Sequence, residues 1–168
     1  MILLLSANII SKVLEINNCD KEILTKALYK AEFWEAIKPT KKLEAEFIAP
    51  NVLYTKVYDE INLIKVPIEM EGELVLTDKG EQDEKGRLIE LNVRNNKDVR
   101  DLEGRLRIKE IAPNKTKLGV FVDNFTLSSD FLNLIGKGAA ELTLRTKISD
   151  MLRNLEKFCK SNSLSNLL

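Results

Sequence analysis

The sequence predicts an α+β domain in which a curved antiparallel sheet of about seven strands wraps around a long C-terminal helix, with two short helices after the first strand. Two observations predict this architecture. Residues 41–127 alternate apolar and polar side chains with the period of half-buried strands. Residues 137–160 instead space their apolar side chains along one face of a helix. A strongly twisted sheet curls, and only this last helix is long enough to cover its concave face.

The chain before the sheet predicts one strand and two short helices. Residues 8–16 are rich in β-branched side chains and partly alternating, so we expect a strand there. Asp20 can cap a helix over residues 21–29. A second helix over residues 31–37 is stopped by Pro39. We expect these two helices to plug one end of the curved sheet.

The middle of the chain predicts six strands of an antiparallel meander, each joined to the next by a short turn. Their expected ranges are residues 41–49, 52–66, 68–76, 87–94, 102–109 and 117–127. In the third of these, Glu69, Glu71 and Glu73 alternate with apolar residues, which favours a solvated row of carboxylates over a catalytic group.

The end of the chain predicts a cap, a long helix and a frayed tail. Residues 128–130 provide the cap. A helix over residues 137–160 would extend about 36 Å, at 1.5 Å per residue. Residues 161–168 are rich in serine and asparagine, so we expect them to fray. The length favours a single domain over residues 1–168.

Composition excludes several classes of function. No apolar run approaches the roughly 20 residues of a membrane-spanning helix, and no signal peptide is recognisable, so we expect a cytoplasmic protein. The sequence has no histidine, which removes the usual general base and the commonest transition-metal ligand. Cys19 and Cys159 do not make a zinc motif, and no nucleotide-binding glycine motif occurs. We therefore expect neither a metal nor a cofactor.

Charge is balanced overall but unevenly distributed. The chain has 26 basic and 26 acidic residues. Residues 1–84 contain 10 basic and 16 acidic residues, and residues 85–168 contain 16 basic and 10 acidic ones. No aromatic residue stands among the basic residues between Arg94 and Lys117. Nucleic-acid binding is therefore not expected, because a stacking platform is missing. The basic half is either a solvated sheet face or a surface for a protein partner.

The pattern of elements resembles a known superfamily over nearly the whole chain. The resemblance is carried by residues 9–28, residues 101–122 and residues 135–158. It is to the START-like (SRPBCC) superfamily, whose members have the helix-grip fold. Among its branches, the chain is most similar to the coenzyme Q-binding and polyketide cyclase group and to the branch that contains the G-type subunit of carbon monoxide dehydrogenase. The resemblance implies an internal cavity that binds a hydrophobic small molecule, a lipid or an isoprenoid.

A cavity between a curved sheet and one helix is also expected on physical grounds, because such a pair seldom closes tightly along its length. Tyr54 and Tyr58 could form its polar end, since a phenol joins an apolar ring to a hydrogen-bonding tip. For each aromatic residue taken singly, the alternative is an ordinary place in the core. A different strand register would also exchange the inward and outward side chains. The residues expected near the cavity are Trp34, Phe47, Tyr54, Tyr58, Phe121, Leu134, Gly138 and Leu142.

Asp123 is a weak candidate for acid–base chemistry, and a tyrosine of the cavity is the other. If Phe121 faces the cavity, Asp123 faces it too, because side chains two apart on a strand share a face. A carboxylate in an apolar cavity can act as an acid or a base. Exposure to solvent near the strand end is the alternative.

The leading hypothesis is non-catalytic binding or transport of a hydrophobic small molecule, whether lipid, isoprenoid or polyketide-like. One alternative is an enzyme of the polyketide cyclase or hydrolase type that uses the same cavity. The other is an interaction subunit of a larger complex that acts through the basic half of the chain. Besides the hydrophobic small molecule or lipid, the expected partners are another protein or a second copy of the chain.

Overall fold

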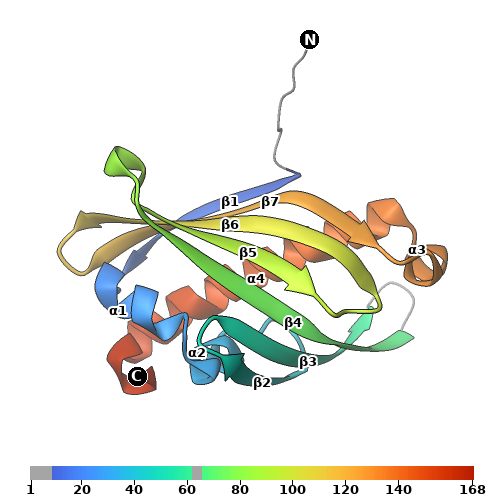
Figure 1. Cartoon of the computed structure of the whole chain (residues 1–168). Helices are drawn as coiled ribbons and strands as arrows, with labels where there is room; N and C mark the ends of the chain where they lie inside the picture. Colours follow the sequence, from blue (N-terminus) through green and yellow to red (C-terminus); the bar gives the residue numbers. More distant parts are fainter. Residues whose placement is uncertain (1–8, 62–65) are drawn as a thin grey trace, which may run out of the picture.

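The computed structural model describes residues 9–61 and 66–168, which contain one antiparallel sheet of seven strands in the order β1-β7-β6-β5-β4-β3-β2 (Figure 1). Neighbours in the sheet follow each other in the chain, except that β1 pairs with β7. The strands are β1 (Ile10–Asn17), β2 (Lys42–Ala49), β3 (Val52–Ile61), β4 (Val66–Glu81), β5 (Arg87–Arg94), β6 (Val99–Ala112) and β7 (Lys115–Leu127).

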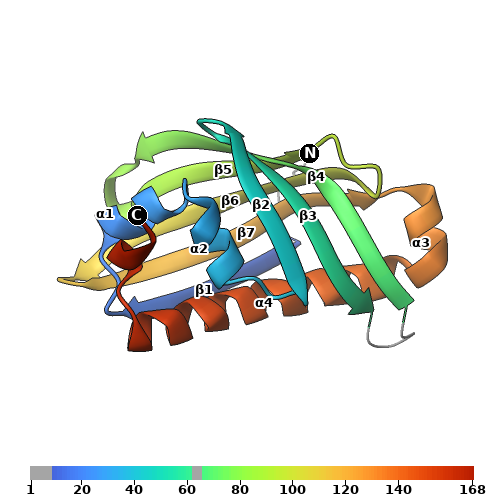
Figure 2. The ribbon, with the colours of Figure 1, turned by 90° about the horizontal axis from the view of Figure 1, so that it is seen from below.

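The long C-terminal helix runs along the sheet, and shorter helices stand at its two ends (Figure 2). Helices α1 and α2 lie at one end, and α3 lies at the other. The predicted helix-grip architecture is therefore confirmed. The helices are α1 (Lys21–Ala27), α2 (Ala31–Ala36), α3 (Ser129–Ile135) and α4 (Lys137–Ser161), with short 3-10 helices over Asp83–Lys85 and Leu164–Leu167.

Element boundaries differ from the prediction mainly around β4. This strand continues to Glu81, five residues beyond the end expected for it. It already begins at Val66, inside the segment expected to belong to the preceding strand. The rest of that prediction falls partly on residues 62–65, which lie outside the described residues. The alternation within β4 is as expected, because Glu69, Glu71 and Glu73 are opposite in phase to the buried Leu76.

The core is filled most completely at the α1 and α2 end. Ile16, Leu24, Phe33 and Leu155 are almost inaccessible to solvent there. The buried residues of α4 are concentrated in its C-terminal half, whereas the first turns of the helix contribute Ala140 alone. The sheet is therefore gripped tightly at one end of α4 and loosely at the other.

A β-bulge on β7 changes which side chains face α4. Before the bulge the inward residues have even numbers, as the buried Leu118 and Val122 show. The extra residue is Asp123, because Val122 and Asn124 pair with consecutive residues of β6. After it, Phe125 and the buried Leu127 face inward. An inserted residue bends the strand and shifts its alternation by one.

The chain end is ordered, contrary to the expectation that residues 161–168 fray. Leu164–Leu167 form a 3-10 helix that contacts α1. Leu164 is 2% exposed, so its burial offsets the conformational entropy lost on ordering this end.

Among the helices of the described residues, none combines the length and the apolar character needed to cross a bilayer.

Candidate functional site

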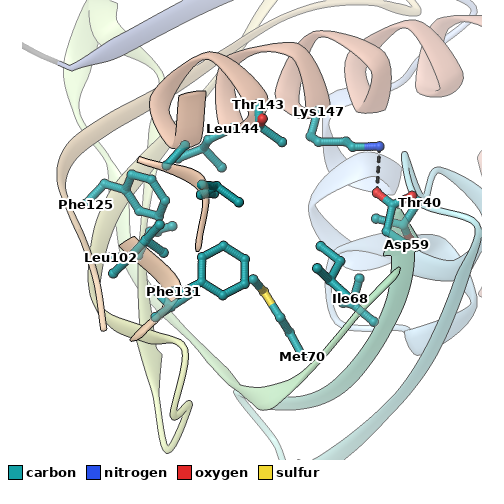
Figure 3. Close-up of a pocket in the computed structure, with 15 residues that line it drawn as sticks. Thr40, Asp59, Ile68, Met70, Leu102, Phe125, Phe131, Thr143, Leu144 and Lys147 are labelled. Atoms are coloured by element: carbon teal, nitrogen blue, oxygen red, sulfur yellow. Dashed lines mark ion pairs between the residues drawn. The ribbon is translucent and has the colours of Figure 1, made fainter. Parts of the chain in front are cut away.

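The candidate site is an apolar cavity of about 170 Å³ at the loosely packed end of α4 (Figure 3). It lies between the first turns of α4, helix α3, strands β3 and β4, and the ends of β6 and β7 that lie nearest α3. Its lining residues are Thr40, Val57, Asp59, Ile68, Met70, Val99, Leu102, Phe125, Leu127, Phe131, Ile135, Ala140, Thr143, Leu144 and Lys147.

Two facing groups of apolar side chains form most of the wall. Phe125 and Leu102 come from the paired strands β7 and β6, while Met70 comes from β4. Figure 3 shows the Phe131 ring and the Met70 thioether side by side along one side of the hollow. A thioether adapts to irregular space and to aromatic neighbours, so Met70 can adjust to a ligand. Such a wall is suited to hydrocarbon groups.

Helix α3 closes one side of the cavity without a core of its own. It is capped by Ser128, whose side chain accepts a hydrogen bond from the Phe131 N–H, and none of its residues is buried. It supplies Phe131 and Ile135 to the cavity. At Gly136, where α3 meets α4, φ is +80°, a conformation that other residues adopt only with strain. This glycine permits the abrupt change of direction between the two helices.

The polar end of the cavity is a single ion pair. The Lys147 Nζ atom of α4 lies 2.6 Å from the Asp59 Oδ2 atom of β3. The Asp59 side chain is only 7% exposed, and the Lys147 side chain is 25% exposed. Lys147 also donates to the Pro39 carbonyl at 3.1 Å. Charged groups this deeply buried require a partner, and here each side chain is the other's counter-ion.

The loop beside this ion pair is held by α4 as well. The Asn154 amide donates to the carbonyls of Ile37 and Lys38, at 3.3 and 2.9 Å. These bonds, with that from Lys147 to Pro39, fix the loop that brings Thr40 to the cavity. The polar end is therefore built on α4 and β3 and tied to the chain between α2 and β2.

A second hollow of about 150 Å³ adjoins the cavity. The two share Phe125, Leu127 and Ala140. Lys137 and Glu141 line the second hollow, which gives it a polar rim. The apolar space thus continues toward the junction of α3 and α4.

None of the eight residues expected at the cavity lines it in the described structure. Trp34 belongs to the end plug, where its indole N–H donates to the Leu28 carbonyl at 2.8 Å. Phe47 stacks at an angle on Tyr29, with ring centroids 6.3 Å apart. Both residues stabilise the end of the sheet away from α3.

Tyr54 and Tyr58 lie on the outer face of the sheet. The Tyr54 hydroxyl donates to a Glu71 carboxylate oxygen, and this bond raises the pKa of Tyr54. Lys42 Nζ lies 5.2 Å from the centre of the Tyr58 ring, in a cation–π contact. The prediction that these tyrosines face the cavity is wrong. The side chains of β3 that point inward are those with odd numbers, which include the fully buried Leu53.

Phe121 and Asp123 also lie on the outer face. The Arg105 guanidinium is 5.2 Å from the centre of the Phe121 ring. The same guanidinium binds both oxygens of Asp123, at 2.9 and 3.0 Å. Asp123 is therefore a surface ion-pair residue outside the cavity, and its candidacy as acid or base is not supported. Phe121 and Asp123 share a face of the sheet, as expected, but it is the outer face and not the face that lines the cavity.

The helical predictions choose the wrong faces of α3 and α4. Leu134 and Leu142 are 49% and 57% exposed, and the space around the Gly138 α-carbon is open. Lining is supplied instead by residues such as Ile135 and Ala140. The spacing from Ala140 to Leu144 and Lys147 follows one helical face, and this signal in the sequence could have identified the lining of α4.

Comparisons with known proteins place the fold. No family model matches the sequence, and no curated protein matches it. Solved structures do. A START superfamily protein from Mycobacterium smegmatis has a TM-score of 0.62 at 19% identity, over 90% of this chain and 96% of that one.

Two similar structures are enzymes. The Zhui aromatase/cyclase from a Streptomyces species has a TM-score of 0.58 at 12% identity, over 94% of this chain and 92% of that one. Norcoclaurine synthase from Thalictrum flavum has a TM-score of 0.54 at 13% identity, over 89% of this chain and 84% of that one. Likeness at these identities establishes the fold alone. The chain thus has the START-like, helix-grip fold.

Proposed function

We propose that the protein binds a small hydrophobic molecule, without catalysis, in the cavity between α4 and the sheet. The observation that carries this proposal is the apolar cavity of about 170 Å³ at the end of α4 where Ala140 alone is buried. The hollow is partly open to solvent and exposes contiguous apolar surface, which a folded protein normally buries, so it needs an explanation. Ligand binding provides one.

The size of the cavity indicates the size of the ligand. A dry apolar cavity of about 150 Å³ is sufficient to bind benzene, so this one suits a molecule of one ring or a short branched chain. Burying about 250 Å² of apolar surface contributes about 6 kcal/mol at 25 cal/mol per Å². That gain corresponds to a Kd between micromolar and millimolar before the costs of association are counted.

The charged groups of the cavity favour binding over catalysis. Asp59 and Lys147 are the ionisable side chains of its lining, and they form an ion pair with each other. A general base or nucleophile must instead be available to the substrate. The norcoclaurine synthase structure of the same fold contains dopamine and hydroxybenzaldehyde. These single-ring molecules support the proposed size of the ligand.

The proposal includes a cytoplasmic location. Cys19 and Cys159 are both buried and free. Free cysteines are typical of reducing compartments, where disulfides are rare.

The test is a titration of the isotope-labelled methionine methyl groups, observed by NMR, with p-xylene as the apolar probe. Met70 lines the cavity, whereas Met151 of α4 packs against the hydrophobic core of the protein, outside the cavity. We expect saturable shifts of the Met70 methyl signal and little change at Met151. The Ala140→Leu variant should lose the Met70 response, because the added atoms occupy the cavity. A Met70 signal that does not move would contradict the proposal.

A further inference from the structure

We propose that the cavity selects an uncharged ligand that carries a hydroxyl group, an alcohol or a phenol, and that Asp59 and Lys147 determine this selectivity. The inference rests on the proposed function and specifies the ligand class of the same site. It is carried by a buried ion pair at one end of a cavity that is otherwise lined almost entirely by apolar side chains. A ligand that fills the cavity places one end against this pair.

The hydrogen-bonding capacity of Lys147 is not exhausted. An ammonium group has three N–H donors. In the part of the chain that the structure describes, Lys147 donates to Asp59 and to the Pro39 carbonyl. One donor therefore remains for a ligand at the cavity wall. Figure 3 shows the Lys147–Asp59 pair at the edge of the hollow.

Asp59 has capacity on the acceptor side. Its Oδ2 atom meets Lys147, and a carboxylate accepts through both oxygens. Asp59 lines the cavity, so its second carboxylate oxygen can accept a hydrogen bond from a ligand. The pair thus offers one donor and one acceptor together. A hydroxyl group both donates and accepts, so it can use both at once, whereas a carbonyl group can use only the donor.

Charge balance excludes ionic ligands. Asp59 and Lys147 compensate each other, so the cavity has no net charge to offer to a carboxylate or an ammonium group. Thr40 and Thr143, the other polar side chains of the lining, are neutral. An ion brought into this site would lose its hydration, and the like charge of the pair would offset the attraction of the opposite one.

The decisive experiment compares four para-substituted toluenes: p-xylene and p-cresol, which match in size, and the slightly larger ions p-toluate and p-methylbenzylammonium. Binding is followed at the Met70 methyl signal. In the unmodified protein we expect p-cresol to bind at least tenfold more tightly than either ion. In the double variant Asp59→Leu/Lys147→Met, the p-cresol to p-xylene affinity ratio should fall at least tenfold. Replacement of a buried ion pair by apolar residues is often tolerated, so we expect this variant to fold.

The control is Arg153→Met on the same helix, which removes a cation paired at the surface with Asp150. It should leave the affinity ratio unchanged. Equal affinities for p-cresol and p-toluate would overturn the inference. So would an unchanged p-cresol to p-xylene ratio in the double variant. Even if the double variant does not fold, the four probes on the unmodified protein decide the question. Failure of all four probes to shift Met70 would instead overturn the proposed function.

Discussion

Filling the cavity from the side of α4 should stabilise the protein and block the site. Ala140 is 4% exposed and lines both the cavity and the adjoining hollow. Ala140→Leu adds three carbon atoms there, which contribute up to about 2.4 kcal/mol at about 0.8 kcal/mol each. Restricting the leucine side chain costs about 0.5–1 kcal/mol. We therefore expect a net gain of about 1–2 kcal/mol in the free energy of unfolding.

The cavity is large enough for this substitution. The pocket has a volume of about 170 Å³ and is partly open to solvent, so the three added carbon atoms have room there. For a domain of this size, a gain of 1 kcal/mol raises Tm by about 2–4 °C.

The assay is urea denaturation together with p-xylene binding. Ala139→Leu is the matched control, because Ala139 precedes Ala140 on the same helix and lines neither hollow. The control should bind p-xylene normally and change stability by less than about 0.5 kcal/mol. Ala140→Leu should weaken binding at least tenfold. If Ala140→Leu instead loses about 1–3 kcal/mol, the usual cost of overpacking, and still binds p-xylene, the proposed location of the site is wrong.

Three further predictions follow from named contacts. Lys147→Met should lower the free energy of unfolding by about 2–3 kcal/mol, because it leaves Asp59 buried without its counter-ion. Urea denaturation measures this change, and a variant as stable as the parent protein would contradict the prediction. Asp123→Asn should cost less than about 1 kcal/mol and leave p-xylene affinity unchanged, because its ion pair lies at the surface; weaker binding would place Asp123 at the site. A hydrogen bond to Cys159 and burial raise the pKa of Cys19 above 9.0. The same bond lowers the pKa of Cys159, so the test is made in the Cys159→Ala background, where burial alone keeps the pKa of Cys19 raised and the unfolded thiol ionises first. Stability should then fall as pH rises through 9.0, with a shallower slope when Cys19→Ala is added; equal slopes would contradict this.

The fold was predictable because its signals repeat over many residues. The alternation of Glu69, Glu71 and Glu73 with apolar neighbours identifies the two faces of β4. Asp20 marks the start of α1 through the hydrogen bond that it accepts from the Ile23 N–H. Such signals depend on local spacing alone and survive small errors in boundaries.

The site was harder to predict because it depends on which of the two alternating sets of side chains in each strand faces α4. In β3, both faces carry large side chains, and the inward set contains the charged Asp59. From the sequence alone, Tyr54 and Tyr58 on the outer face therefore resemble a cavity lining more closely than the inward set does. In β7, the bulge at Asp123 reverses the alternation, so Phe125 is inward and Phe121 is outward. Only the pairing with Arg105 and its strand makes this shift visible.

Intermolecular nuclear Overhauser effects from a bound probe show directly whether the binding site lies between α4 and the sheet. With p-cresol bound, we expect contacts from its ring to the Met70 methyl group and the Phe131 ring, which lie together in the cavity wall. Contacts confined to Tyr58 or Phe121, on the outer face of the sheet, would contradict a binding site between α4 and the sheet.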